Sequence, residues 1–364
     1  MTVLDASLQV DLGEFDLDLD LRCGQGVTAL LGANGSGKTT ALKALAGLHQ
    51  LTSGHVHLGA DEWAAGRTHL PPEARSVGMV LADPLLFPHL SLLDNVAYGP
   101  RSRGMPRRTA RARAAEELAR VGLSDLAHRK PAQVSQGQAQ RASLARALAT
   151  DPELLLLDEP LSALDPETRS RTRADLAARL RSYPGVTVLV THDALDALTL
   201  ADHLVFLDGG RVTQTGTPAE IVARPRNAYV AGVVGLNLLS GTLATDPGPH
   251  LLLGAAASAP RSTAGRLVLA DAPDGAQAGD PIWATIAPEA VALFTQRPHS
   301  SARNVWQLSV DAVTVTGPRA RVHLTGEVDL VAEVTLAAVA ELGIVGGTQL
   351  WATVKATEVT AYRA

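Results

Sequence analysis

The sequence contains a single cysteine, Cys23, among its 364 residues. One cysteine cannot form an intramolecular disulfide or a cysteine-cluster metal site, and it is compatible with a reducing compartment. Only 3% of the residues are aromatic, so the cores must be built from Leu, Val, Ile and Ala. The formal net charge of −5 gives no overall attraction to nucleic acid, which we therefore do not expect as a partner.

Long apolar runs are also missing from the sequence. No stretch approaches the roughly 20 apolar residues that a helix needs to span a bilayer. The N-terminus lacks a basic start and reaches Asp5 before any long apolar run, so we do not expect a signal peptide. A role at a membrane would therefore have to run through a partner protein.

The patterns that are present divide the chain into two parts. The first two thirds contain short continuous apolar runs separated by helical segments, which is typical of a mostly parallel α/β sheet. Later, short alternating strands separated by turn signals predict a small all-β domain folded as a barrel. The expected boundaries are 1–232 for the α/β domain, 233–243 for a linker and 244–364 for the barrel.

A glycine-rich segment follows the apolar run 27–31 and opens a helix, and it fits the phosphate-loop pattern G-x-x-x-x-G-K-[ST]. Its glycines let backbone N–H groups surround phosphates, and the helix N-terminus adds its positive dipole end. Lys38 would reach the β- and γ-phosphates, and the Thr39 hydroxyl would bind Mg²⁺. The predicted ATP-binding residues are Gly32, Ala33, Asn34, Gly35, Ser36, Gly37, Lys38, Thr39 and Thr40.

Two carboxylates follow the apolar run 154–157, at the edge where open α/β sheets bind ligands. Asp158 suits the Mg²⁺ shell, and Glu159 is the better general base for a hydrolytic water because the metal does not need it. Asp165 follows shortly afterwards. His192 comes directly after the next strand, where it could touch a γ-phosphate.

The segment Ser135-Gln136-Gly137-Gln138 lies between the phosphate loop and these carboxylates. Ser135 and Gln138 form a Ser-x-x-Gln capping box, which predicts the start of a helix that runs to about Ala149. The dipole of that helix makes its start a second site for an anion.

The order of these motifs resembles that of the nucleotide-binding subunits of ABC transporters, over roughly residues 1–232. The resemblance implies an ABC cassette of the P-loop NTPase class, with a helical subdomain, that hydrolyses ATP with Mg²⁺. It also implies a homodimer in which Ser135, Gln136, Gly137 and Gln138 close over the partner's ATP, with Asp165 in a loop at the dimer interface. The implied location is the cytoplasmic face of the membrane, bound to permease subunits that work with an extracytoplasmic solute-binding protein.

The sequence departs from the family's usual pattern at Val134, Gln136 and Ala82. Gln136 stands where the family has glycine, although Ser135 and Gly137 are retained. Ala82 occupies the position of a glutamine that, in the family, helps to bind Mg²⁺ and water and senses the membrane subunits. The aromatic residue that stacks on adenine is not obvious, and Phe15 is a weak candidate.

The predicted barrel resembles the TOBE domain of importer ATPases, an OB-like barrel. Two of its segments, one near residue 303 and one near residue 355, resemble the oxyanion-binding motifs of molybdate importers. A tetrahedral dianion needs cationic groups, hydroxyls and free N–H groups around it. The residues that the resemblance selects are Ser301, Arg303, Asn304, Lys355 and Thr357.

The sequence therefore predicts the ATPase of an ABC importer whose cargo is molybdate. Sulfate, tungstate or another small solute stays open as the cargo. Three other classes compete with an active importer ATPase: an ABC ATPase with no transport role, an exporter half, and a catalytically dead regulatory paralogue. The chain lacks long coiled-coil insertions, a second cassette and fused membrane helices, which disfavours the first two. Ala82 and Gln136 are the only support for the third.

Overall fold

A computed structural model describes residues 2–162, 164–254 and 265–364 of the chain. The chain folds into two compact units, Met1–Ile221 and Val222–Ala364. The first contains both α-helices and β-sheets and the second is mostly β, as the sequence predicts. The segment 233–243 differs from the expected linker, because most of it belongs to β12 (Asn237–Ala244), a strand of the second unit.

The first unit is built around a six-stranded sheet of order β11-β10-β3-β9-β8-β7. All of its neighbouring strands are parallel except β10 and β11. Every residue of β8 and β9 is buried, which explains why their sequences are continuous apolar runs. The strands are β3 (Gly26–Gly32), β7 (Val77–Val80), β8 (Leu154–Asp158), β9 (Val186–Val190), β10 (His203–Asp208) and β11 (Arg211–Gly216).

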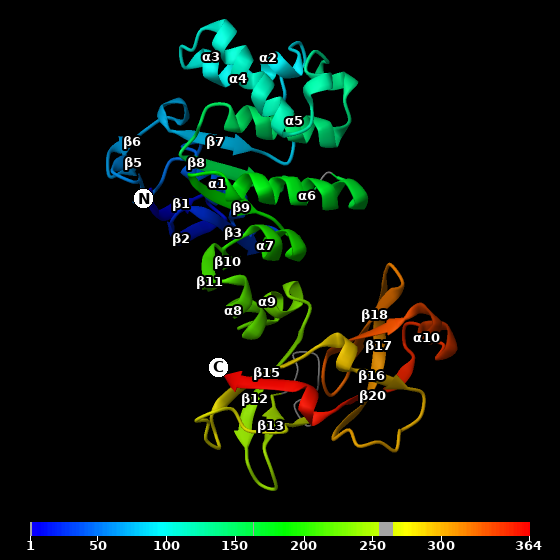
Figure 1. The fold of residues 1–364 in the computed structure, drawn as a ribbon. Helices are drawn as coiled ribbons and strands as arrows, with labels where there is room; N and C mark the ends of the chain where they lie inside the picture. The colour runs from blue at the N-terminus through cyan, green and yellow to red at the C-terminus, as the bar shows by residue number, and fades with distance from the viewer. Residues whose placement is uncertain (1, 163, 255–264) are drawn as a thin grey trace. The chain divides into compact units, whose positions relative to one another are not determined.

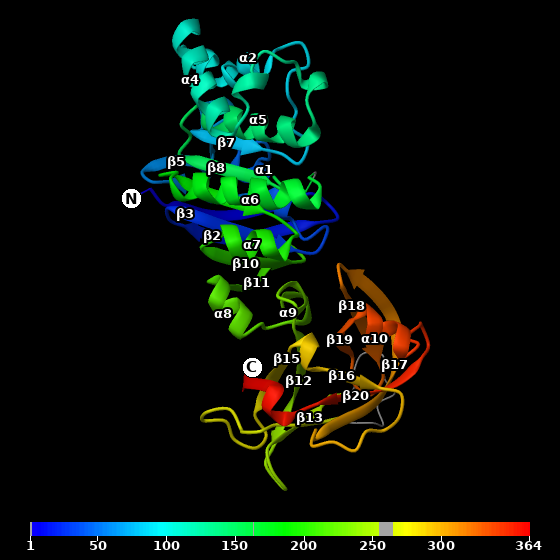
Figure 2. The same ribbon diagram turned by 45° about the vertical axis from the view of Figure 1, so that its right-hand side comes forward.

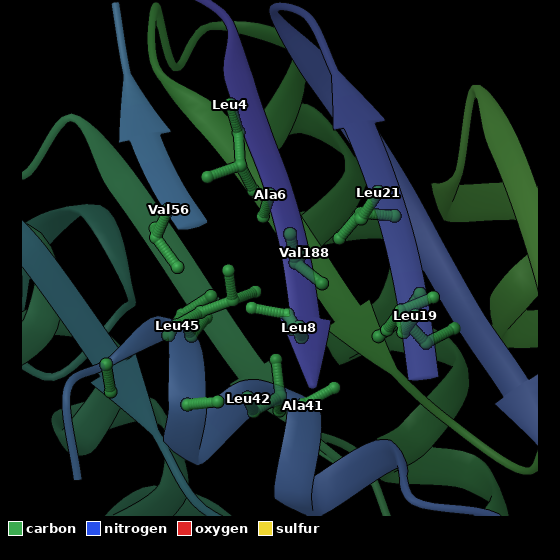
Figure 3. Packing of buried hydrophobic residues seen from close by; sticks show 14 of the residues in the cluster. Leu4, Ala6, Leu8, Leu19, Leu21, Ala41, Leu42, Leu45, Val56 and Val188 are labelled. Atoms are coloured by element: carbon green, nitrogen blue, oxygen red, sulfur yellow. The ribbon is translucent and has the colours of Figure 1, made fainter. Parts of the chain in front are cut away.

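A second, antiparallel sheet of order β2-β1-β4-β5-β6 covers the helix that follows the phosphate loop. That helix, α1 (Lys38–Leu45), contacts strands of both sheets. Figure 3 shows Ala41, Leu42 and Leu45 of α1 packed with Leu8 of β1 and Val188 of β9. The strands of this sheet are β1 (Leu4–Asp11), β2 (Asp16–Cys23), β4 (Ser53–Leu58), β5 (Asp61–Ala65) and β6 (Thr68–His69).

Arg75 is a fully buried charged side chain at the C-terminal end of α1. Its guanidinium donates hydrogen bonds to the carbonyl oxygens of Ala44 and Leu45, at 3.1 and 2.7 Å, and also to those of Leu70 and Trp63. The last carbonyls of a helix have no partner within the helix, so this side chain supplies their donors. Burial lowers the pKa of Arg75 to about 10, which leaves it charged at neutral pH.

Four helices form a separate group within the first unit, which Figures 1 and 2 both draw beyond β7. They pack around their own apolar cluster, which includes Leu92, Leu118 and Ala142. This group is the helical subdomain that the family resemblance implies. Its helices are α2 (Leu92–Val96), α3 (Tyr98–Ser102), α4 (Arg107–Arg120) and α5 (Gln136–Leu148). The first unit also contains α6 (Pro166–Arg181) and α7 (Ala194–Leu200), and α8 (Pro218–Ala223) spans the division between the units.

The second unit consists of two five-stranded antiparallel sheets that share one apolar core, consistent with an OB-like barrel. Their orders are β14-β13-β12-β15-β21 and β16-β20-β17-β18-β19. The helices of this unit are α9 (Ala228–Val233) and α10 (Leu336–Glu341). Its strands after β12 are β13 (His250–Leu253), β14 (Arg266–Val268), β15 (Pro281–Ile286), β16 (Ala292–Phe294), β17 (Asn304–Thr316), β18 (Arg319–Thr325), β19 (Leu330–Thr335), β20 (Gln349–Val354) and β21 (Val359–Arg363).

None of the helices in the described ranges combines the length and the apolar character that a membrane span requires.

Candidate functional site

The predicted phosphate loop connects the end of β3 to the start of α1. Gly37 caps α1 in a left-handed conformation (φ 101°) without a side-chain hydrogen bond, so the first N–H groups of the helix stay available to an anion. A side chain at Gly37 would also meet Phe15 at 2.8 Å, which adds a steric reason for glycine. The loop therefore has the local geometry that its sequence predicts.

Lys38 is buried within this loop. Its Nζ donates hydrogen bonds to the carbonyl oxygens of Gly32 and Ala33, at 2.9 and 2.8 Å. Burial lowers the pKa of the Lys38 ammonium, and the nearby carboxylates of Glu159 and Asp158 oppose that shift. A phosphate group would favour the charged ammonium further.

Thr39 and Asp158 come together although 119 residues separate them in the sequence. The Thr39 hydroxyl donates a hydrogen bond to Asp158 Oδ2 at 3.3 Å. Burial raises the pKa of the Asp158 carboxyl, and the hydrogen bond from Thr39 opposes this shift. A divalent cation beside the carboxylate would favour its charged form.

Glu159 follows Asp158 at the end of β8, and its backbone lies in the left-handed region (φ 46°). This conformation is unfavourable for a residue with a side chain and is seen most often at functional sites. The Glu159 N–H donates to the carbonyl of Val190 at 2.9 Å, which fixes the turn. Glu159 Oε1 lies 2.9 Å from Nδ1 of His192, so the two predicted catalytic side chains are in contact.

Arg169 on α6 holds the loops that carry these two residues, and sequence reasoning missed it. Its guanidinium donates to the carbonyl oxygens of Leu161 and Ser162 in the loop after Glu159. It also pairs with Asp193, next to His192, at 3.0 Å. No motif marks Arg169, because its partners are assembled only by the fold.

One cavity of about 530 Å³ is lined both by residues of the phosphate loop and by Glu159. Phe15 and Leu12 line the same cavity, so Phe15 remains the candidate for stacking on a base. The cavity is lined by Leu12, Phe15, Asn34, Gly35, Gly37, Lys38, Thr39, Thr40, Glu159 and Val190.

The helix start predicted from Ser135 and Gln138 is confirmed. The Ser135 hydroxyl accepts a hydrogen bond from the Gln138 N–H at 3.3 Å, and Gln138 Oε1 accepts one from the Ser135 N–H at 2.9 Å. Ser135 and Gln136 are exposed, and Gly137 is half-buried. The surface that they form is therefore open to another molecule.

Asp165 caps the start of α6 and is exposed. Its carboxylate accepts a hydrogen bond from the Thr168 N–H at 3.0 Å, which lowers the pKa of the carboxyl. Residue 163, within the same predicted loop, lies outside the described residues. Ala82 is exposed on the loop after β7 and has no polar side-chain atom with which to replace a glutamine.

The predicted oxyanion residues are only partly brought together in the second unit. Ser301 and Lys355 line one cavity of about 510 Å³, together with Glu289 and Glu358. Arg303 and Thr357 are exposed and are not among the lining residues.

Asn304 differs from the expectation that it binds an anion. It is buried, and its amide exchanges two hydrogen bonds with the backbone of Val268, at 2.6 and 3.0 Å. The Asn304 side chain therefore ties β17 to β14.

Comparison with known proteins covers both units. Residues 15–162 match the ABC transporter family, and residues 300–361 match the TOBE domain. The molybdenum import ATP-binding protein ModC of Mycobacterium tuberculosis is 39% identical over 360 residues, which cover 96% of this chain and 94% of that protein. The Fe(3+) ions import ATP-binding protein FbpC of Rhizobium etli is 44% identical over 220 residues, which cover 60% of this chain and 61% of that protein.

Solved structures also resemble part of the chain. The cbiO1 subunit of the cbiONQ transporter complex from Clostridium perfringens has a TM-score of 0.54 and 27% identity, over 61% of this chain and 90% of that chain. A dimeric ATP-binding cassette in a post-hydrolysis state, bound to ADP and Pi, has a TM-score of 0.52 and 28% identity, over 60% of this chain and 99% of that chain.

Proposed function

This chain belongs to the ABC transporter family of import ATPases and carries a TOBE domain, and from that premise we propose that it powers the import of molybdate. The observation that carries the proposal is the extent of the likeness to the molybdenum import protein, which includes 94% of that protein's length. The iron importer's ATPase matches over 220 residues, a length that the first unit alone accounts for. Likeness that extends through the barrel therefore favours molybdate over iron.

In the proposed mechanism, the N–H groups at the start of α1 and the Lys38 ammonium bind the β- and γ-phosphates of ATP. These donors stabilise the negative charge that develops as the terminal phosphoryl group is transferred. The cavity that contains Lys38 also contains Phe15, which we assign to the adenine end of the nucleotide.

Glu159 acts as the general base. A water molecule attacks the γ-phosphorus, its proton passes to the Glu159 carboxylate, and the bond from the γ-phosphorus to the bridging oxygen breaks to give ADP and phosphate. The contact between His192 and Glu159 supports a role for His192 in orienting that carboxylate. Arg169 holds both loops in place.

The oxygen atoms beside the phosphate loop are suitable ligands for Mg²⁺. The Thr39 hydroxyl and the Asp158 carboxylate are oxygen ligands of the kind that Mg²⁺ prefers. The described residues contain no group of three or more His, Cys, Asp or Glu side chains able to hold a metal by themselves. Nucleotide phosphates and water would therefore complete the shell, and the bound ion would neutralise charge on the transferring phosphoryl group.

We assign Ser135, Gln136, Gly137 and Gln138 to the ATP held by a second copy of the chain. The open N-terminus of α5 and the exposure of Ser135 support this assignment. Asp165 would lie in the dimer contact. The working complex would then contain two copies of this chain on permease subunits, at the cytoplasmic face of the membrane, with an extracytoplasmic binding protein that delivers the cargo.

Ala82→Gln tests whether the missing glutamine limits the enzyme. A glutamine at residue 82 restores a hydrogen-bonding group beside the metal and its water, so we expect ATP turnover to rise, or to depend more on transported substrate, by roughly two- to tenfold. Steady-state ATP hydrolysis in vesicles that contain the permease measures the turnover and its dependence on transported substrate. An unchanged rate and unchanged coupling would mean that another residue already fills the role, and the exposed neighbour Asp83 is the first to test.

The barrel supplies a further binding site in this proposal. Lys355 and Ser301 line its cavity, but the carboxylates of Glu289 and Glu358 oppose an anion there. A dianion therefore needs more positive charge than Lys355 alone, and the exposed Arg303, which shares a sequence motif with Ser301, is the candidate.

Titration of the full chain with molybdate, tungstate and sulfate tests this site. We expect molybdate and tungstate to bind ahead of sulfate, which is smaller. Lys355→Met and Arg303→Ala should each weaken molybdate binding about ten- to a hundredfold, because each removes a charge-assisted contact of about 1.5–3 kcal/mol. Arg319→Met, which changes an exposed arginine paired with Glu333, is the control. No heat with molybdate would leave the barrel without a binding role, and cargo selection would rest on the partner proteins.

A further inference from the structure

The helical subdomain meets the sheets at a contact that contains a cavity of about 30 Å³, with both apolar and polar side chains on its walls. The walls come from α4 and α5 on the helical side and from β7, α6 and the loop after β8 on the other. Gln140, Arg141 and Arg179 are among the lining residues. The volume admits about two water molecules.

Unpaired buried polar atoms gather at this cavity. In the described part of the chain, four buried side-chain nitrogen or oxygen atoms have no hydrogen-bond partner: Gln140 Oε1, Arg141 Nε, Arg179 Nε and Thr187 Oγ1. The first three belong to residues that line the cavity. An unpaired buried polar atom costs about 1–3 kcal/mol, so three on the walls of one cavity are a cost that this contact retains.

Two hydrogen bonds cross the same contact between the subdomains. Gln140 Nε2, on α5, donates to the carbonyl oxygen of Leu81 at 3.0 Å, in the loop after β7. Arg179, on α6, donates to the buried carboxylate of Glu117, on α4, at 2.8 Å. Apolar packing at such a contact would be at least as stable, so polar groups there point to a role in orientation.

We propose that this contact is a joint between the helical subdomain and the sheets, and that Gln140 is a positioning residue that sets the angle of α5 against the sheets. Gln140 lies five residues after Ser135 on the same helix, about 7.5 Å along its axis. Because a helix is stiff over that distance, the Leu81 contact fixes where Ser135 and Gly137 meet the ATP of a second copy. The inference rests on the proposed function, since it requires that second copy.

The contact also bears on the missing glutamine. Leu81 immediately precedes Ala82, which cannot reach from its loop to other groups by hydrogen bonding. Gln140 donates a hydrogen bond to the same loop, at the carbonyl of Leu81. Residue Gln140 of α5 therefore links that loop to the segment Ser135-Gln136-Gly137-Gln138 at the start of the same helix.

The test uses two variants of the full chain that carries Glu159→Gln, in which the ATP-bound dimer accumulates. Gln140→Met keeps the volume but removes both polar atoms, and Gln140→Glu keeps an oxygen for the cavity but loses the donor to Leu81. We expect ATP-driven dimerisation, measured by sedimentation at several chain concentrations, to be about tenfold weaker in both. ATP affinity at concentrations where the chain is monomeric should change less than twofold, because the phosphate loop is untouched.

Thr187→Val is the matched control, because it removes the one unpaired buried atom that belongs to β9 and not to the cavity. Its dimerisation should equal that of the parent. Dimers of equal strength in the parent and in Gln140→Met, or equal weakening in Thr187→Val, would overturn the joint. If Gln140→Glu dimerises as strongly as the parent, the hydrogen bond to Leu81 is not what positions α5. A parent chain that forms no dimer with ATP would instead contradict the proposed function.

Discussion

Glu159→Gln is expected to lower ATP turnover by about 10²–10⁴-fold, because it removes the general base while keeping the volume and polarity of the side chain. ATP binding should stay intact, since the phosphate loop and Lys38 do not change. The unhydrolysed nucleotide should also trap the dimer. On the purified full chain, phosphate release measures the ATP turnover, and nucleotide affinity measures whether ATP binding stays intact.

Glu167→Gln is the matched control for this prediction. It makes the same chemical change on α6, at a side chain that is 82% exposed and pairs only with Arg171 among the ion pairs of the described residues. Its turnover should equal that of the wild type. Near-normal hydrolysis by Glu159→Gln would remove Glu159 from the reaction, and His192 would become the next candidate.

Arg75→Met should destabilise the first unit by about 3–5 kcal/mol. The substitution leaves the carbonyls of Leu45 and Leu70 without their charged donor, and each loss costs about 1–3 kcal/mol. Because α1 carries Lys38 and Thr39, the loosened helix end should also weaken ATP binding. Thermal unfolding should show a midpoint lower by roughly 10 °C.

Arg171→Met provides the comparison, because Arg171 is 82% exposed and makes only a surface ion pair. Its unfolding midpoint should stay within about 1–2 °C of the wild type. An Arg75→Met chain as stable as this control would mean that water or a shifted backbone satisfies the carbonyls, and the guanidinium would lose its assigned role.

The parts of the site that the sequence predicts are those set by local pattern. The phosphate loop needs glycines at fixed spacing, and the capping box of Ser135 and Gln138 lies within one turn of helix. The continuous apolar runs correctly indicate buried parallel strands. In the first two cases the interacting groups are neighbours in the sequence, and in the third the apolar run alone indicates burial, although the paired strands are far apart in the sequence.

The residues that sequence reasoning missed act across long separations. Gln140 bonds to Leu81, 59 residues away, and Arg179 bonds to Glu117, 62 residues away. Arg75 bonds to the end of α1 about 30 residues earlier. No period or spacing encodes such contacts, because they depend on how the helical subdomain and the sheets pack.

The barrel is where the motifs and the fold agree least. Lys355 and Ser301 share a cavity, but its walls also contain the carboxylates of Glu289 and Glu358, which the motifs did not reveal. Asn304 belongs to the same sequence motif as Arg303, yet its amide is engaged with the backbone of β14. A sequence motif identifies residue types but not the charges that surround them.

The proposed role of this chain is to power molybdate uptake by ATP hydrolysis. Its most direct test is molybdate uptake by cells that lack the gene, complemented with the wild type, with Glu159→Gln or with Glu167→Gln. We expect the deletion to abolish high-affinity molybdate uptake and to leave sulfate uptake unchanged, with rescue by the wild type and Glu167→Gln but not by Glu159→Gln. Unchanged molybdate uptake in the deletion strain, or full rescue by Glu159→Gln, would contradict the claim.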